Sequence, residues 1–356
     1  MNKLLGLIPL AAFLALLPAS AEAPKPDQDG FVPLFNGKDL TGWVNVNCAP
    51  DTFYVKGNEI ITTGKPTGYL RTEKQYENFE LEMEWMHENK TAMGNSGLFV
   101  WGDPIPAVGT GYTRGIEVQI LVNFNADWAT SHGDLFSIWG AQCKPDRPHP
   151  KGAQRCLPSE NRCKGGGEWN HYKVTGKDGV LKLAVNGKEV SGVSECTPRK
   201  GYLALESEGA VCHFRNLKIK EFPSTNPKPS EIADVDTGYK SIFDGVSFKG
   251  WKLDDGAWKA NDGVIRCAGK TNLTTEKTLK NFEILFDRKS PDGKVEALLG
   301  DKPLSLTIDA AKNAKPNSWA RCRAKVTDAT EAKTLALVAA QGLEIRNVFV
   351  HELPAK

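Results

Sequence analysis

The sequence has almost no excess of charge of either sign. It contains 45 Lys and Arg residues against 43 Asp and Glu residues, which leaves a formal net charge of +2. A protein that binds nucleic acid or an anionic membrane surface by electrostatics needs a basic excess. We therefore expect neither of these as a partner.

Long hydrophobic runs are also missing after the first twenty residues. Lys3 is followed by the apolar run LLGLIPLAAFLALLP and then by small residues at 19–21, the pattern of a secretory signal peptide. The run is short for a membrane span. Cleavage after Ala21 fits as well as cleavage after Ala23, and no cysteine precedes Cys48 to carry a lipid anchor. We expect residues 1–21 to be removed, leaving a soluble periplasmic or secreted protein without a membrane anchor.

Metal-binding motifs are not evident. No CxxC occurs, and the six histidines are scattered along the chain, whereas zinc sites use such ligands at short, fixed spacings. No loop is rich in Asp, as a calcium site would require. The sequence therefore predicts no metal and no other cofactor.

The eight cysteines are read as disulfide partners, because export to an oxidising compartment favours disulfides. They are Cys48, Cys143, Cys156, Cys163, Cys196, Cys212, Cys267 and Cys322. Six lie before residue 220 and two after it, which predicts a Cys267–Cys322 bridge. The first six allow fifteen connectivities, and their spacing does not choose among them. Three crowd the segment 143–163, where we expect at least one bridge.

The mature first half shows no convincing helical period, but strand signals recur throughout. Short runs rich in β-branched and aromatic residues alternate with Gly, Asn, Asp and Pro. They cover 59–64, 79–86, 97–101, 115–121, 135–140, 171–176, 181–187, 202–209 and 211–222. Asn186-Gly187 is a hairpin turn signal. Many short strands at close spacing predict an all-β sandwich. The stretch LSLTIDAAKNA at 304–314 fits either a strand or a short helix.

The chain repeats itself. PLFNGKDLTGWVNVN at 33–47 matches SIFDGVSFKGWKLDD at 241–255, and LRTEKQYENFELEMEW at 70–85 matches LTTEKTLKNFEILFDR at 273–288. The closing FRNLKIKEF at 214–222 matches IRNVFVHEL at 345–353. Pro, Ser, Thr and Asp dominate the segment between the copies, which is typical of a linker. We predict domains at 31–222 and 240–353, joined by a linker at 223–239.

The second copy is shorter than the first. Phe79 and Trp169 are 90 residues apart, whereas their counterparts Phe282 and Trp319 are 37 apart, so about 53 residues are missing. The missing block is the part of the first copy that holds Asn95, Glu117, Gln119, His132 and Trp139. We expect any chemistry to lie in the first copy. The aromatic residues with counterparts in the second copy are expected to hold the sandwich together; they are Trp43, Phe79, Trp169 and Phe214.

Several motifs occur together in the order seen in one known family. FNGKDLTGW, YENFELEMEW, NSGLFVW, GIEVQI, EWNHYKV, VNGKEV and FRNLKI resemble the 3-keto-disaccharide hydrolase domain. The resemblance covers residues 31–222, and 240–353 as a degenerate second copy. It implies two concanavalin-like jelly-roll sandwiches, the second truncated, in agreement with the strand pattern. It also implies a substrate that carries a ketone at C3 of one sugar, in a disaccharide or other glycoside.

The sequence departs from the family in two places. The family strand reads close to E-x-Q-I-x-D, but Val122 stands where the second acid is expected, and the segment 144–167 is longer and richer in cysteine. A ketone at C3 makes the C2 proton acidic, so a single general base can drive loss of the C1 substituent. Ordinary glycoside hydrolysis needs two flanking carboxyl groups. The missing acid therefore favours elimination.

Glu117 is the expected acid or base, with Gln119 beside it. In the strand GIEVQI, the period of two places Glu117, Gln119 and Leu121 on one face and the three aliphatic residues between them in the core. From the residues alone, that face is either ordinary surface or the floor of a site, and the resemblance favours a site. His132 is a further proton-transfer candidate, because histidine titrates in the useful range; a loop histidine bonded to a neighbour fits equally well.

Five further residues are predicted to bind substrate. Asn95, with Ser96, could donate to a sugar or enolate oxygen, although their sequence GNSG is more typical of a turn. Tyr112 and Trp139 could stack on sugar rings, as could Trp101; the alternating pattern around Trp139 favours core packing instead. Arg114 would orient Glu117 or a substrate oxygen, and Glu208, near Glu206, could supply a second carboxylate.

Three functions remain open at this point. The first is an exported enzyme that cleaves 3-keto-disaccharides or 3-keto-glycosides. The second is a non-catalytic, lectin-like carbohydrate-binding protein, since the same fold serves both purposes. The third is a secreted surface protein in which both copies only mediate contacts. Convergence of the polar candidates on one concave pocket would favour the enzyme.

Overall fold

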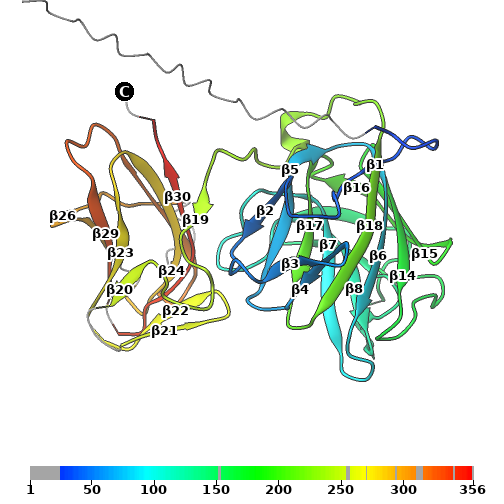
Figure 1. Ribbon diagram of the computed structural model, residues 1–356, viewed down its shortest axis with the longest axis horizontal. Helices are drawn as coiled ribbons and strands as arrows, with labels where there is room; N and C mark the ends of the chain where they lie inside the picture. The colour runs from blue at the N-terminus through cyan, green and yellow to red at the C-terminus, as the bar shows by residue number, and fades with distance from the viewer. Residues whose placement is uncertain are drawn as a thin grey trace, which may run out of the picture.

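The structure, a computed structural model, describes residues 25–150, 154–253, 257–269, 271–292, 295–309, 316–339 and 341–354. The predicted signal peptide at 1–21 lies outside these residues. Within them, the regular elements are β-strands apart from one short 3-10 helix, η1 (Pro229–Glu231), and no helix is long and apolar enough to cross a membrane. The prediction of an all-β protein built from two sandwiches is confirmed (Figure 1).

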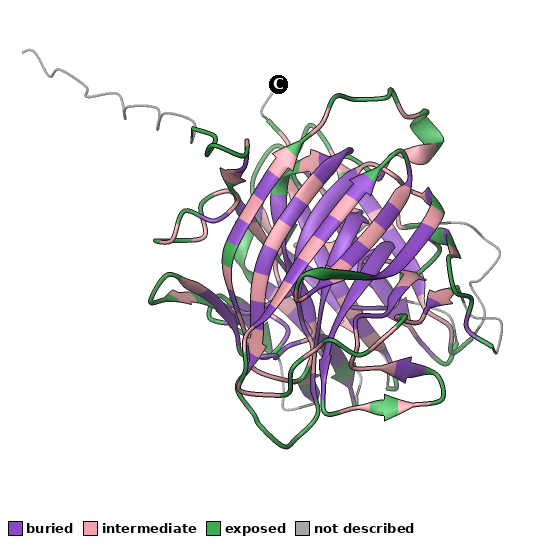
Figure 2. Ribbon diagram, turned by 90° about the vertical axis from the view of Figure 1, so that its right-hand side faces the viewer, coloured by how far each residue is buried: buried purple, intermediate pink, exposed green. Residues whose placement is uncertain are grey.

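The larger sheet of the first domain forms from strands with alternating apolar and polar residues. Its strands, in spatial order, are β12 (Gln142–Pro145), β16 (Lys188–Thr197), β15 (Val180–Val185), β14 (Asn170–Lys177), β6 (Phe79–His87), β18 (Cys212–Glu221), β4 (Glu59–Thr62) and β3 (Phe53–Lys56), with β1 (Val32–Pro33) beside β18. In β6 the apolar residues are buried and the three glutamates between them are half-buried. Figure 2 shows this alternation as stripes across the sheet. The β15–β16 hairpin turns at Asn186-Gly187, as predicted, with φ of 48° and 88°.

The second sheet of the first domain packs on the inner face of the first and carries the strand GIEVQI. Its strands, in spatial order, are β13 (Arg155–Cys156), β11 (Leu135–Ile138), β8 (Gly115–Val122), β7 (Gly94–Gly102), β17 (Gly201–Ser207), β5 (Gly68–Tyr76) and β2 (Trp43–Val46). A small hairpin of β9 (Asn125–Ala126) and β10 (Ala129–Thr130) lies beyond β8. All β8 residues are buried, so whatever polar groups it carries must find partners or serve a site.

The second domain repeats this arrangement with fewer strands. One sheet contains β21 (Trp258–Asn261), β22 (Val264–Cys267), β30 (Glu344–Glu352), β24 (Phe282–Lys289), β28 (Ala320–Val326) and β27 (Thr307–Ile308), with β19 (Lys240–Ser241) beside β30. The other contains β20 (Trp251–Leu253), β23 (Thr271–Leu279), β29 (Lys333–Ala339), β25 (Glu296–Leu299) and β26 (Lys302–Pro303). Within the described residues, β26 pairs with β25 as β8 pairs with β7 and is the last strand of this sheet, whereas β11 and β13 continue the sheet beyond β8 in the first domain. The ambiguous stretch 304–314 forms a strand at Thr307–Ile308, and its residues from 310 onward lie outside the described part.

Most of the shared aromatic framework packs as predicted. Trp43, Phe79 and Phe214 belong to the core of the first domain, and the counterparts of these residues belong to the core of the second. Trp169 is an exception, because it is half-buried and lies under the Arg215 guanidinium, 3.7 Å from the ring centroid. The expectation that Trp169 holds the sandwich together is therefore wrong.

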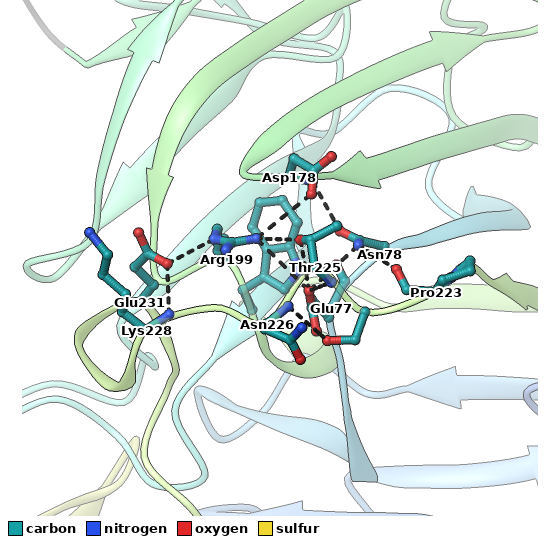
Figure 3. Close-up of polar contacts among 11 residues, drawn as sticks. Glu77, Asn78, Asp178, Arg199, Pro223, Thr225, Asn226, Lys228 and Glu231 are labelled. Atoms are coloured by element: carbon teal, nitrogen blue, oxygen red, sulfur yellow. Dashed lines mark hydrogen bonds and ion pairs between the residues drawn. The ribbon is translucent and has the colours of Figure 1, made fainter.

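The segment between the domains is anchored to the first domain. The Glu77 carboxylate accepts hydrogen bonds from the Ser224 hydroxyl (2.6 Å) and the Thr225 amide (2.8 Å). Arg199 donates to the Thr225 hydroxyl (2.9 Å) and to Glu231 at the end of η1 (3.0 Å). Its guanidinium therefore links two points of this segment to the first domain (Figure 3). These contacts fix the path by which the chain reaches the second domain.

The predicted disulfides are not formed. Seven cysteines are free thiols: Cys48, Cys143, Cys156, Cys163, Cys196, Cys212 and Cys322. The predicted Cys267–Cys322 bridge is therefore absent, and no bridge staples the segment 143–163. All but Cys163 of these thiols are buried, where cysteine packs as a small apolar residue. Burial raises the pKa of the Cys163 thiol to about 12.

Candidate functional site

A cavity of about 330 Å³ opens on the outer face of the sheet that contains β8. Its lining comes from β7, β8, β11, β13, β17 and the loops beside them. The lining residues are Met93, Asn95, Tyr112, Glu117, Gln119, Leu121, Phe124, Trp128, Ala129, Phe136, Trp139, Arg155, Glu206 and Glu208. This volume lies at the low end of the range of ligand pockets, about 300–1,000 Å³, and the lining combines aromatic rings with convergent carboxyl groups.

Strand β8 divides its side chains as the period of two predicts. Glu117, Gln119 and Leu121 line the cavity, while the three aliphatic residues between them belong to the core. Val122 also belongs to the core and is 1% exposed. An acid at position 122 would therefore point away from the cavity. The departure of this strand from the family pattern removes no carboxylate from the site.

Two carboxyl groups approach each other over a glycine. Gly97 on β7 pairs with Gln119 on β8. A Cβ atom at Gly97 would lie 2.9 Å from Glu206 Oε2 and 3.0 Å from Glu117 Oε1. The two carboxyl oxygens are therefore within about 6 Å of each other. Only glycine leaves room for both, so the strand position 97 shapes the floor of the cavity.

Of the three carboxyl groups in the cavity, Glu208 accepts the most hydrogen bonds. Tyr112 Oη donates to Glu208 Oε1 at 2.7 Å, and Asn95 Nδ2 donates to Glu208 Oε2. Gln119 Nε2 in turn donates to Asn95 Oδ1 at 2.7 Å, which orients the Asn95 amide with its nitrogen toward Glu208. Gln119 therefore acts through Asn95. The expectation that Asn95 and Ser96 form a turn is wrong, because both lie in β7.

The three carboxyl groups differ in how their pKa values are set. Burial, together with the charge of Glu208, raises the pKa of Glu117 to about 8. Burial and the charges of Glu117 and Glu208 raise the pKa of Glu206 well above its usual range. Burial also raises the pKa of Glu208, but the hydrogen bonds from Tyr112 and Asn95 act in the opposite direction. The hydrogen bonds therefore favour the charged form of Glu208, whereas burial favours the protonated forms of Glu117 and Glu206.

Aromatic rings form one wall of the cavity. The Trp139 side chain is 52% exposed and stacks on Tyr112, with ring centroids 6.2 Å apart and planes 14° apart. Trp128 is 57% exposed, and the Arg155 guanidinium lies 5.8 Å from its ring centroid. Trp139 has a φ of 51° at the end of β11, a conformation that non-glycine residues seldom adopt. The expectation that Trp139 packs in the core is wrong.

Three of the residues considered in the sequence lie elsewhere. His132 is half-buried and does not line the cavity; burial lowers its pKa. Arg114 forms a two-point ion pair with Asp103, with Nε 2.7 Å from Oδ2, so it does not orient Glu117. Trp101 is fully buried, and its indole nitrogen donates to the Glu77 carbonyl.

The cavity residues that were not predicted include Glu206, Arg155 and Trp128. Glu206 was visible in the strand 202–209 next to Glu208, and the same period of two that selected Glu117 would have placed both on one face. Arg155 donates to Asp134 at 2.7 Å and lies over Phe136, 3.6 Å from the ring centroid. Nothing in the local sequence of Arg155 indicated this position.

Comparison with known proteins identifies the family of the chain. The sequence profile of a family described as the 3-keto-alpha-glucoside-1,2-lyase-like domain matches residues 30–220 and 238–341. The chain belongs to this family. A candidate glycosyl hydrolase from Parabacteroides distasonis ATCC 8503 is 24% identical, with a TM-score of 0.42 over 55% of this chain and 95% of the other. The carbohydrate binding module CBM66 from Bacillus subtilis is 12% identical, with a TM-score of 0.38 over 51% and 96%. No curated protein matches.

In the part of the chain that the structure describes, no group of three or more His, Cys, Asp or Glu side chains has an arrangement that could hold a metal ion. The three cavity carboxyl groups come from β8 and from β17 with the residues after it, two strands of one sheet with β7 between them, and all three have raised pKa values. Their arrangement suits proton transfer.

Restoring the acid of the family strand is expected to harm this protein. Val122→Asp would place a carboxyl group in the core of the first domain, where no hydrogen-bond donor awaits it, and should reduce the free energy of unfolding by about 3 kcal/mol or more. Urea denaturation would measure this loss, with Val122→Ala as the control for lost packing. A Val122→Asp protein that is as stable as Val122→Ala would contradict the assignment of this side chain to the core.

Truncating the aromatic wall is expected to weaken binding more than turnover. Trp139→Ala removes a face on which a sugar ring can stack, an interaction worth about 0.5–1.5 kcal/mol. KM should rise roughly 2- to 12-fold with kcat nearly unchanged. Steady-state kinetics would check this, with Tyr54→Ala as the control, since Tyr54 is also an exposed aromatic residue but lies outside the cavity. A fall in kcat at unchanged KM would contradict it.

Proposed function

We propose that this protein cleaves 3-keto-glycosides by removing the C2 proton and expelling the C1 substituent. One observation carries the proposal: the Glu208 carboxylate, which accepts hydrogen bonds from Tyr112 and Asn95, shares an aromatic-walled cavity with Glu117, whose pKa burial raises to about 8. A base and an acid with separated pKa values are what such an elimination needs. The family description, a 1,2-lyase-like domain for 3-keto-alpha-glucosides, supports the same chemistry.

The ketone at C3 makes the reaction possible without a covalent intermediate. Glu208 takes the C2 proton, and the electron pair left at C2 is delocalised onto the C3 oxygen as an enolate. The pair then forms the C1–C2 double bond while the C1–O bond breaks, and Glu117 delivers its proton to the departing oxygen. The products are an unsaturated keto-sugar and an alcohol, and no water is consumed. Glu117 thus serves as the acid, and Glu208 rather than Glu117 serves as the base.

The other cavity residues support these two groups. Gln119 and Asn95 hold the Glu208 carboxylate through a chain of two hydrogen bonds. Arg155 is the cation of the lining, and it suits the charge that develops on the C3 oxygen. Trp139 offers a face to the sugar ring. We also propose, from the signal peptide pattern, that the protein meets its substrate outside the cytoplasm.

The test is to incubate the protein from residue 22 onward with 3-keto-trehalose and 3-keto-sucrose. The expected results are release of the intact second sugar and the ultraviolet absorbance of a conjugated enone, with no reaction of trehalose or sucrose. Deuterium at C2 of the keto-sugar should slow turnover several-fold, because the C2–H bond breaks in the proposed step. Folded protein that cleaves no keto-disaccharide would overturn the proposal. Tight binding of the same sugars without turnover would identify a carbohydrate-binding protein instead.

A further inference from the structure

The loop of residues 103–114 links the catalytic candidates to the second domain. It joins β7 to β8 and contains Tyr112, whose hydroxyl donates to Glu208 and whose ring stacks on Trp139. Tyr112 also packs against a small apolar cluster that contains residues of both domains, among them Leu285 and Phe349 of the second. The position of this loop therefore determines whether the Glu208 carboxylate keeps the hydrogen bond from Tyr112.

Side chains of the second domain hold the loop by its backbone. The bonds run from the Gly109 amide to Asp287 (2.9 Å), from Arg321 to the Pro106 carbonyl (2.8 Å), from Asn347 to the Thr110 carbonyl (2.8 Å) and from Arg346 to the Gly109 carbonyl (3.2 Å). A buried backbone group needs such a partner. The loop also has hydrogen bonds of its own, such as that from the Ala107 amide to the Tyr112 carbonyl (2.9 Å), and the second domain adds these four at residues 106–110.

The side chains that hold the loop form one buried hydrogen-bonded network. Arg321 makes two hydrogen bonds to the Asp287 carboxylate, 2.8 and 3.1 Å long, and Asn347 donates to the same carboxylate at 2.6 Å. The side chains of Arg321 and Asp287 are 7% and 0% exposed. A buried pair that is fully hydrogen-bonded is rigid, and removing one partner is strongly destabilising. The network thus offers the loop a fixed set of donors and acceptors.

The loop also fits closely against an aromatic ring of the second domain. Gly109 has a φ of +77°, and a Cβ atom there would lie 2.4 Å from Trp319 Cγ. Any side chain at position 109 would push the loop off this surface. The sequence GTGYT at 109–113 therefore meets the second domain through a glycine that has no room for a substituent.

The equivalent positions of the first domain form a similar face. On β6, Glu84 stands opposite Arg215 and His171, and in the second domain Asp287 stands opposite Arg346 and Arg321 in the same register. In the first domain the Glu84 carboxylate accepts from Arg215 (2.6 Å) and Asn216 (2.9 Å) and is 26% exposed. This face holds no loop there.

Two differences between the domains allow this face of the second domain to hold the loop. Asp287 replaces a glutamate, and the shorter side chain leaves room for the Gly109 amide. Arg321 replaces His171, and its guanidinium reaches both Asp287 and the Pro106 carbonyl. Within the described residues the second copy has no counterparts of β11 and β13, but its outer face contacts the loop that carries Tyr112.

We propose that the second domain is a positioning domain, in which Asp287, Arg321 and Asn347 hold the 103–114 loop so that Tyr112 donates its hydrogen bond to Glu208. This rests on the proposed function of the cavity. The three residues touch no substrate and act through Tyr112. Without these contacts from the second domain, the Glu208 carboxylate loses the hydrogen bond from Tyr112. Trp139 also loses the Tyr112 ring on which it stacks.

The test compares the full-length protein with Arg321→Ala and Gly109→Ala, which break the same contact from its two sides. Each should lower kcat/KM by about 10- to 100-fold, since small misplacements of a catalytic group have effects of this size. Each should also move the acidic limb of the pH profile to higher pH, because Glu208 loses a hydrogen bond that lowers its pKa. Neither change should add to the effect of Tyr112→Phe in the double variant. His171→Ala, at the equivalent position of the first domain, should behave as wild type.

Several results would overturn the proposal. These are wild-type kcat/KM in both variants, an unshifted pH profile, or losses that add fully to those of Tyr112→Phe. Gly109→Ala guards against misfolding, since it leaves the second domain unchanged. If even the wild type cleaves no keto-glycoside, the proposed function fails by itself. Hydrogen exchange of the peptide 103–114 then decides the positioning claim: faster exchange in Arg321→Ala supports it, and unchanged exchange contradicts it.

Discussion

Glu208→Gln is expected to reduce kcat on 3-keto-glycosides by about 10²- to 10⁴-fold, the usual contribution of a general base. Glutamine keeps the shape of the side chain and can still accept the hydrogen bond from Tyr112. It cannot accept a proton from C2. Because substrate binding through the aromatic wall is untouched, KM should change much less than kcat. Steady-state kinetics with 3-keto-trehalose and 3-keto-sucrose would measure both.

Glu195→Gln is the matched control, since Glu195 is 71% exposed and pairs with Lys144, which is 69% exposed. It should leave kcat unchanged. Exchange of the C2 proton with deuterated water separates the base from the acid: Glu208→Gln should abolish it, whereas loss of the acid should leave it in place. Wild-type kcat in Glu208→Gln would show that another group removes the proton.

Glu117→Gln is expected to have the second large effect, again about 10²- to 10⁴-fold on kcat for sugars with a poor leaving group. Its pKa of about 8 keeps Glu117 protonated at neutral pH, so the wild type should lose activity as the pH rises through about 8. The variant has no proton to deliver, so this alkaline limb should vanish. A phenol at C1 leaves without protonation, and with such a substrate the variant should recover most of its activity. Equal losses with both leaving groups would contradict the role of Glu117.

The same substitution is expected to stabilise the fold. Glu117 has a folded pKa raised from 4.5 to about 8, so the unfolded chain releases the proton more readily than the folded one. The stability that the protonated group contributes is complete below pH 4.5 and is lost as the pH rises toward 8. Glu117→Gln does not titrate and should be more stable than wild type at pH 8 by roughly 2–4 kcal/mol. Urea denaturation at pH 5 and pH 8 would measure this gap, and an equal gap at both values would refute the pKa shift.

The strand pattern and the duplication were readable from the sequence because both rest on local rules. A period of two specifies which side chains share a face, whatever the neighbouring strands do. It correctly separated Glu117 and Gln119 from the core residues of β8. The matched motifs of the two copies likewise indicated two sandwiches and the block of strands that the second copy lacks.

Convergence of side chains from distant strands was not readable. Glu206 and Glu208 lie about 90 residues after Glu117, and their approach depends on the order β8-β7-β17 in the sheet. The exposure of Trp139 depends on a backbone conformation that ends β11. Cysteine spacing was misleading, because the sequence shows how many thiols are present but not how their Cβ atoms face one another.

The sequence by itself determined the all-β class, the duplication, the family and the carboxyl-bearing strand. Each of these follows from the order of residues along the chain. Only the tertiary structure decided which carboxyl groups have raised pKa values, and which loop the second domain contacts. Both depend on groups far apart in the chain, because a pKa responds to burial and to neighbours within a few ångströms. The hydrogen bonds of Asp287 and Arg321 to the 103–114 loop likewise form only when the two domains pack together.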